Sequence, residues 1–423
     1  MRSSARLVAL LFVGTALNYV DRQALALLKP TLLAEFGWTD LQFAHLGSAF
    51  QFTTAAAVLG AGWIVDRVGV RTAYGAAVGL WSAAGIGHAF ASTISQFVTA
   101  RVVLAAAESV NTPAAVKAAA RYLPLEGRSL GLGLINTAPN IGAVLTPLLI
   151  PPFALAFGWR AAFAVTGALG FVWLLAWVPL TRGLAPDTAV RTAPASGAVT
   201  DAPPPAAKGA AFWRALLRDP RTWAVAGAKL LTDMVWWFLL FWTPDLFARV
   251  FHMTQSTLGG PIAVIYSMAA LGAVSGGLLF PALVRRGLTV NAARKRSMLA
   301  YALLILPVPL ALQAASPWSA ALLIGLALFA HQGFSTNLFG FTADTVPLER
   351  VATVVAAGAV VGNLAGMGMI EFTGWSLTAG VGYWPMFAIS ASAYLLATGW
   401  IHLLVPVITP YRETSDVAPN AGA

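Results

Sequence analysis

Long apolar runs alternate with short polar stretches along almost the whole chain. Each run holds about 20 predominantly apolar residues, which is the length that an α-helix needs to cross a bilayer. The pattern predicts an all-α membrane protein with twelve transmembrane helices, at 7–27, 43–65, 72–91, 96–121, 128–156, 161–180, 222–250, 258–282, 297–315, 318–343, 350–374 and 383–406.

The first apolar run lies where a cleavable signal peptide would also lie. It has no small-residue cleavage site, and it is long enough to span a bilayer. We therefore expect it to be the first transmembrane helix.

The hydrophobic pattern fails between the sixth and seventh runs. Residues 182–211 are rich in Pro and Ala and have the composition of a flexible, cytoplasmic linker. Six spans on each side predict an N-terminal six-helix bundle at 1–181 and a C-terminal six-helix bundle at 212–423. Paired six-helix repeats, with the substrate bound near the midplane between them, are one plan of secondary transporters.

The composition agrees with a membrane protein. Only 10% of the residues are charged, against roughly 25% in soluble domains. The net charge of +10 does not require a nucleic-acid partner, because most Lys and Arg residues fall in cytoplasmic segments if the N-terminus is cytoplasmic. This is the positive-inside bias, and it predicts that both termini are cytoplasmic.

Several kinds of chemistry are excluded or not expected. The sequence contains no cysteine, which excludes disulfides and thiolate sites, and it has no Gly-rich phosphate loop. His331 has no second His at i+4, so we expect no metal. With no cofactor motif and no activated nucleophile, we expect a protein that is not an enzyme.

Ionisable residues inside the predicted spans are few. An ionisable side chain at the bilayer centre costs at least ~2.5–3.5 kcal/mol on insertion scales, so those that persist usually face a cavity or pair with one another. The candidates for such buried charges are Asp21, Arg22, Arg101, Glu108, Lys229, Asp233 and Glu371.

The spacing of these charges predicts a network between the first and fourth spans. Arg101 and Glu108 are two helical turns apart and share one face. Asp21 and Arg22 are adjacent and point roughly 100° apart, so one can face a cavity while the other faces a helix. A purely structural role stays open, but buried ion pairs are weak stabilisers, which favours function.

This network suits proton-coupled anion uptake. A carboxylate that exchanges an Arg partner for the substrate during the transport cycle would bind and release a proton. The Arg fork matches a carboxylate with two hydrogen bonds, so Arg is the natural ligand for an anionic substrate.

The seventh span carries a second charged pair and the tryptophans Trp236, Trp237 and Trp242. Lys229 and Asp233 are four residues apart and can pair locally, as a gate or as a helix-end salt bridge. Trp236 and Trp237 are candidates for stacking on a sugar, whereas Trp242, near the end of the span, suits an interfacial aromatic belt.

Amide side chains inside the spans offer both donors and acceptors to a polyol. For any one of them, an interhelical hydrogen bond is the alternative, but together they predict a polar cavity. They are Gln51, Asn136, Asn140, Asn337 and Asn363.

The loop after the second span reads G-A-G-W-I-V-D-R-V-G-V-R, with Asp66, Arg67 and Arg71 at its charged positions. It resembles the signature loop of the major facilitator superfamily, in which the Asp and Arg latch the cytoplasmic side. The resemblance implies that these three residues take part in gating.

Two further motifs resemble the anion:cation symporter family of that superfamily, especially its hexuronate transporters. They are N-Y-V-D-R in the first span, and the stretch from Arg101 to Lys117 in the fourth. The resemblance implies proton-driven uptake of a sugar acid across a bacterial inner membrane. The roles it implies are proton coupling by Asp21 and Glu108, anion binding or positioning by Arg22 and Arg101, and sugar contacts by Tyr19 and Asn337.

These observations predict a monomeric, alternating-access symporter that imports protons with a hexuronate, galacturonate or glucuronate. An aldonate or another small organic anion is the nearest alternative substrate. A transporter-like membrane sensor, which binds its ligand and signals to a partner, is an alternative of a different class.

Overall fold

The computed structural model describes residues 2–123, 125–182 and 210–408. Within these ranges the regular structure is helical throughout, as the hydrophobic pattern predicts. The expected linker, 182–211, lies outside the described residues except at its two ends. Arg182 ends α7, and α8 begins at Ala210.

The first half of the chain forms seven helices. The fourth predicted span is split into α4 and α5, because the ring of Pro113 clashes with a helical carbonyl four residues earlier, at Ser109. The bounds are α1 Arg2–Phe36, α2 Asp40–Val68, α3 Val70–Phe90, α4 Ile94–Glu108, α5 Asn111–Tyr122, α6 Leu125–Phe157 and α7 Trp159–Arg182.

The second half begins with a short helix and continues with six spans. The predicted span at 297–315 is built from α11 and a 3₁₀ segment, η2, which follows Pro307. The bounds are α8 Ala210–Arg218, α9 Pro220–Val250, α10 Gly259–Arg285, α11 Val290–Leu304, η2 Val308–Gln313, α12 Pro317–Thr345, α13 Leu348–Thr378 and α14 Trp384–Leu404.

Nine described helical stretches are long and apolar enough, by length and composition, to cross a membrane. The three other predicted spans lie in α1, in α3 and in α4 with α5. α1 carries Asp21, Arg22 and Lys29, and α4 ends after 15 residues at Glu108. Two of these polar residues of α1, Asp21 and Arg22, belong to the site described below.

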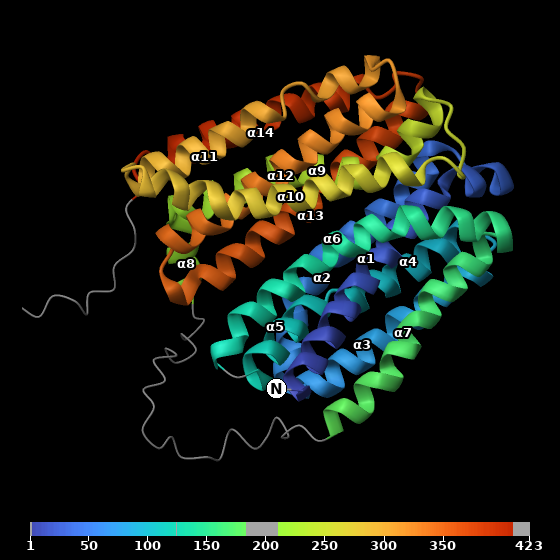
Figure 1. The fold of residues 1–423 in the computed structure, drawn as a ribbon, viewed down its shortest axis with the longest axis horizontal. Coiled ribbons are helices and arrows are strands. Elements are labelled where there is room, and N and C mark those ends of the chain that lie inside the picture. The colour runs from blue at the N-terminus through green and yellow to red at the C-terminus, as the bar shows by residue number, and fades with distance from the viewer. Residues whose placement is uncertain (1, 124, 183–209, 409–423) are drawn as a thin grey trace, which may run out of the picture.

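The two halves lie side by side, with the blue-to-green helices of the first half against the yellow-to-red helices of the second (Figure 1). α2 packs on α13, α6 on α10 and α1 on α9. Glycines permit this close approach. A Cβ on Gly374 of α13 would lie 2.4 Å from the Cβ of Ala44, and one on Gly259 of α10 would lie 2.5 Å from the carbonyl oxygen of Pro147.

We name the two ends of the bundle by their chain segments. The linker end holds the end of α7 and the start of α9. The opposite end holds the end of α1 at Phe36, the start of α2 at Asp40 and the end of α9 at Val250. There, Thr39 and Gln42 close a capping box at the start of α2, which fixes the turn between the first two spans.

Candidate functional site

The centre of the first half holds an ion pair between Arg22 of α1 and Glu108 at the end of α4. The Nε of Arg22 donates to Oε2 of Glu108 at 2.8 Å, and the two side chains are 13% and 0% exposed. The guanidinium carbon lies 5.3 Å from the ring centroid of Tyr19 and 5.2 Å from that of Phe50. Arg22 is therefore held between a carboxylate and two aromatic rings.

Arg101 lies beside this pair with unused hydrogen-bonding capacity. It is 2% exposed, and its guanidinium carbon lies 4.7 Å from the ring centroid of Phe50. Within the described part of the chain, Nε and Nη1 of Arg101 and Oε1 of Glu108 have no hydrogen-bond partner. An unpaired buried polar group costs about 1–3 kcal/mol, so these atoms are suited to receive a polar ligand.

Asp21 points away from Arg22, as their adjacency in a helix requires. It is buried, it lies beside Thr166 of α7, and it is within electrostatic reach of Glu108 and Arg101. Asp21, Arg22, Arg101 and Glu108 thus form one group of two acids and two bases inside the first half.

The central cavity lies between the two halves. Arg22, Gln51 and Arg101 line it from the first half, and Trp237, Phe241 and Ile370 line it from the second. Its volume is about 20 Å³, which is space for about one water molecule. The halves are therefore closed around the centre in this structure.

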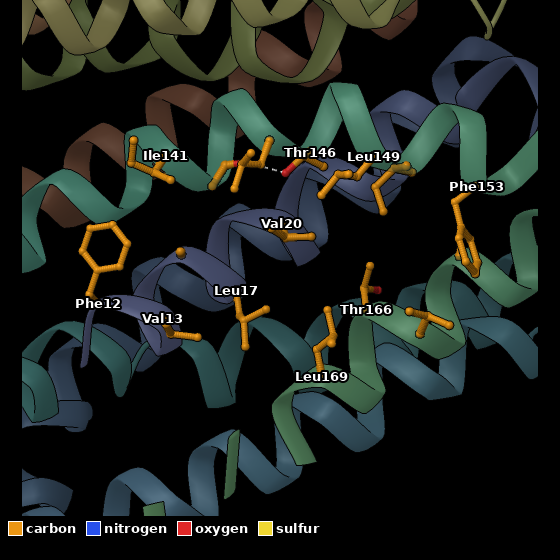
Figure 2. A pocket seen from close by; sticks show the side chains of 16 residues that line it. Phe12, Val13, Leu17, Val20, Ile141, Thr146, Leu149, Phe153, Thr166 and Leu169 are labelled. Atoms are coloured by element: carbon orange, nitrogen blue, oxygen red, sulfur yellow. Dashed lines mark hydrogen bonds between the residues drawn. The ribbon is translucent and has the colours of Figure 1, made fainter. Parts of the chain in front are cut away.

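A larger groove, of about 440 Å³, lies between α1, α6 and α7 (Figure 2). Apolar side chains such as Leu17, Val20 and Leu149 line it. Its Thr146 donates to the carbonyl oxygen of Gly142 in its own helix. This lining offers no charged partner to a carboxylate, so volume alone does not identify the anion site.

Three tryptophans of α9, Trp236, Trp237 and Trp242, lie in different environments. Trp237 lines the central cavity, whereas the ring of Trp236 stacks on His331, with centroids 4.9 Å apart. The interfacial-belt interpretation of Trp242 is wrong: this side chain is fully buried, and the Nζ of Lys29 lies 4.0 Å from its ring centroid.

Among the amides whose side chains the structure describes, Gln51 lines the central cavity. The Nδ2 of Asn337 donates to the carbonyl oxygen of Gly333 in its own helix, and its Oδ1 accepts a hydrogen bond from Arg294. The Nδ2 of Asn363 donates to the carbonyl oxygen of Ala359. Asn337 and Asn363 are thus bonded within the second half.

The two remaining amides lie on α6. The side chain of Asn140 is half-buried, and that of Asn136 lies outside the described residues. Their predicted contacts with the substrate stay predictions.

The predicted gating residues of the signature loop lie at the linker end. Asp66 pairs with Lys117 of α5 at 2.8 Å, while Arg67 lies over the ring of Trp63. Arg71 is exposed, and its carbonyl oxygen accepts a hydrogen bond from the indole of Trp177. The loop pattern led us to expect an Asp–Arg latch, and it missed Lys117, although this lysine ends the fourth-span motif.

The ion pair that the sequence predicts on α9 is present in the structure. Lys229 and Asp233 pair at 2.7 Å, as their spacing predicts. Glu371, the last of the intramembrane charges, accepts from or donates to His45 of α2 at 2.8 Å, depending on the protonation of the two groups. It therefore joins α13 to α2.

Sequence reasoning missed a charged cluster at the opposite end. The Nζ of Lys29, which is 0% exposed, lies 2.7 Å from Oδ1 of Asp40 and 2.9 Å from Oδ1 of Asp245. Arg249 pairs with both carboxylates, and the hydroxyl of Tyr383 donates to Asp245. We call these five residues the Lys29 cluster. Lys29 falls two residues beyond the predicted first span, so it escaped the search for intramembrane charges.

The chain is similar to known membrane transporters. The family model of the Major Facilitator Superfamily matches residues 11–370. The chain is 28% identical to the hexuronate transporter of Escherichia coli (strain K12), over 98% of each chain. It is 26% identical to the galacturonate transporter of Dickeya chrysanthemi, over 69% of this chain and 85% of that one.

A solved structure shares the fold. It is a bacterial homologue of the human lysosomal transporter Spinster, in an inward-facing and occupied conformation. The TM-score is 0.72 at 18% identity, and the match covers 95% of this chain and 96% of that one. The helical arrangement is therefore one that a known transporter adopts.

Proposed function

This chain belongs to the Major Facilitator Superfamily, and on that premise we propose that it imports a hexuronate, galacturonate or glucuronate, together with protons. It is a multi-pass membrane transporter rather than an enzyme, and its relatives are transporters of sugar acids. The observation that carries the proposal is the Arg22–Glu108 pair at the edge of a cavity that both halves line.

The anion binds at Arg22 and Arg101. A carboxylate that enters the cavity competes with Glu108 for Arg22, and it meets the unpaired Nε and Nη1 of Arg101. The planar guanidinium groups suit a carboxylate, because each can form two parallel hydrogen bonds with it. Tyr19, Gln51 and Trp237 contact the sugar.

The proton binds at Glu108, with Asp21 as its second carrier. When the substrate takes Arg22, Glu108 loses its charged partner in a buried place, and an unpaired buried carboxylate is costly. Protonation removes this cost. Substrate binding and proton binding therefore favour one another, and a proton gradient drives the accumulation of the acid.

The halves alternate around the site, with the central cavity open first to one face and then to the other. From the positive-inside bias we infer that the linker end and both termini face the cytoplasm. We also propose that the protein acts as a monomer in the inner membrane of a bacterium. Asp66, Arg67 and Arg71 then belong to the cytoplasmic gate.

The test is uptake of labelled galacturonate into proteoliposomes with an imposed proton gradient. Wild type accumulates the acid, and dissipation of the gradient stops accumulation. Glu108→Gln, which mimics the protonated acid, loses gradient-driven accumulation but keeps counterflow exchange. Full accumulation by this variant contradicts the coupling role, and an absence of uptake by wild type contradicts the proposal as a whole.

An aldonate is the second candidate, because it carries the same carboxylate and differs from a uronate at the far end. One of the relatives, 28% identical over 82% of this chain, is a probable L-galactonate transporter of Escherichia coli (strain K12). Competition of unlabelled aldonates against labelled galacturonate in the same assay ranks the two classes.

A further inference from the structure

A second ion pair inside the bilayer region belongs to the second half. The Nζ of Lys229 lies 2.7 Å from Oδ2 of Asp233, and the side chains are only 15% and 12% exposed. A buried ion pair contributes little to stability, and ionisable groups within membrane spans mark functional places. We therefore expect this pair to have a function besides stabilising α9.

Two glycines of α13 make room for the pair. A Cβ on Gly362 would lie 2.2 Å from Oδ2 of Asp233, and one on Gly358 would lie 3.1 Å from Cγ of Lys229. α13 can approach this part of α9 because these positions carry no side chain. The packing of α13 thus preserves the pair at a fixed place.

The ammonium of Lys229 lies among groups that bind polar ligands. With Ser335, Phe339 and Thr342 of α12 it lines a small cavity of about 10 Å³, and its Nζ lies 5.6 Å from the ring centroid of Phe339. A hydroxyl donates and accepts, an ammonium donates and a carboxylate accepts. This combination suits the oxygens of a polyol or of an anion.

Tyr19 connects this pair to the Arg22–Glu108 pair. The guanidinium carbon of Arg22 lies 5.3 Å from the Tyr19 ring centroid, and the phenol is also within electrostatic reach of Asp233. α1, which carries Tyr19, packs on α9. The first half thus presents Arg22 beside Glu108, the second half presents Lys229 beside Asp233, and Tyr19 is within electrostatic reach of both pairs.

We propose that Lys229 and Asp233 form a second subsite, which binds the end of the sugar acid that lies opposite its Arg22-bound carboxylate. This inference rests on the proposed function. Asp233 accepts hydrogen bonds from sugar hydroxyls, and Lys229 donates to a terminal oxygen. A terminal carboxylate is the strongest partner for Lys229, since its hydrogen bond is charge-assisted. The subsite thus ranks six-carbon sugar acids by their far end, with a diacid above a uronate.

The experiment measures this ranking. Unlabelled galactarate, a diacid, and unlabelled galacturonate compete with labelled galacturonate for uptake into proteoliposomes, and the ratio of their half-inhibitory concentrations is determined. In wild type galactarate is the stronger competitor. The double variant Lys229→Met with Asp233→Asn removes both charges and leaves no unpaired carboxylate. We expect it to shift the ratio by at least about tenfold towards galacturonate, the effect of losing one charge-assisted hydrogen bond.

A second readout keeps the test valid if the double variant no longer transports. The rise in Tm that each acid gives the purified protein is compared, and the extra rise from galactarate is expected to disappear in the double variant. Arg296→Met, on an exposed position of α11, is the control and keeps the wild-type ratio.

The possible failures are distinct. An unchanged ratio in a folded double variant, or equal binding of both acids by wild type, overturns the second subsite but leaves hexuronate import intact. A wild-type protein that neither accumulates nor is stabilised by either acid overturns the proposed function, and the subsite with it.

Discussion

The ion pairs at the two ends of the bundle connect different parts of the chain. At the opposite end, Lys29 of the first half pairs with Asp245 of the second, and Arg249 pairs back with Asp40. At the linker end, Asp66 pairs with Lys117 inside the first half, and Arg294 pairs with Asp344 inside the second half.

The difference separates two uses of charge. A pair that crosses the halves is broken when the halves part, so it sets which face of the transporter is closed. A pair inside one half survives that motion, so it contributes to the stability of the half. Further contacts add to closure at the opposite end, since Thr31 donates to Gln255 and the backbone N–H of Leu41 donates to Thr378.

Among the variants considered, Lys29→Met is expected to open the opposite end the most. Two buried carboxylates are then left with Arg249 as their cation, and breaking a buried pair costs about 3–5 kcal/mol. The opposite end opens more often. The chain has no cysteine, so a thiol introduced at Ser48, which lies buried against α13, is the single reporter. Its labelling rate is expected to rise at least about tenfold. The rise would be larger if the full cost of the broken ion pair, about 3–5 kcal/mol, favoured opening.

The control for this variant is Arg160→Met. Arg160 pairs with Glu35 at the same end, but both residues belong to the first half. Labelling at Ser48→Cys is expected to stay at the rate of the parent protein. An equal rise in both variants would show that any lost charge at this end opens it, whether or not its pair crosses the halves.

A smaller rise in the labelling rate is expected for the double variant Lys29→Met with Asp245→Asn. The second change removes the carboxylate that lost its lysine, while Asp40 and Arg249 still pair across the halves. The labelling rate returns to within about threefold of the parent, because two charges of opposite sign are removed together. If labelling of the double variant is as fast as that of Lys29→Met, then the loss of the Lys29–Asp245 contact controls closure. The unpaired carboxylate would not be the cause.

The smallest effect on labelling is expected from Arg294→Met at the linker end. Arg294 pairs with Asp344 and donates to Asn337, so its loss lowers the free energy of unfolding by about 1–3 kcal/mol. The Tm in detergent falls, while the labelling rate at Ser48→Cys changes less than twofold. A large rise in labelling would contradict the division between the two ends.

The hydrophobic pattern predicts an all-α membrane protein, and the described regular structure is helical with long apolar helices. The pattern also predicts one continuous fourth span, whereas the structure divides it into α4 and α5 near Pro113. The charges inside the spans also identify the residues that meet in the first half, since helical geometry alone puts Arg101 and Glu108 on one face. Arg22 then reaches Glu108 from α1.

The contacts between halves could not be predicted in this way. Lys29, Asp245 and Arg249 lie at the ends of spans, where charged residues are ordinary, and their partners are far away in the sequence. The buried place of Trp242 depends on the same packing. Similarly, the bonds that hold Asn337 depend on Arg294 of another helix, which no spacing within α12 reveals.

The Lys29 cluster has an electrical consequence. Lys29 and Asp40 both belong to the first half, and Arg249 and Asp245 both belong to the second. When the halves part, each keeps one cation and one anion, so no net charge is left on either side. A single elementary charge that crosses the membrane field gains about 2.3 kcal/mol per 100 mV, and this cluster moves none. The Lys29 cluster is therefore expected to add no voltage dependence to the reopening of the empty carrier.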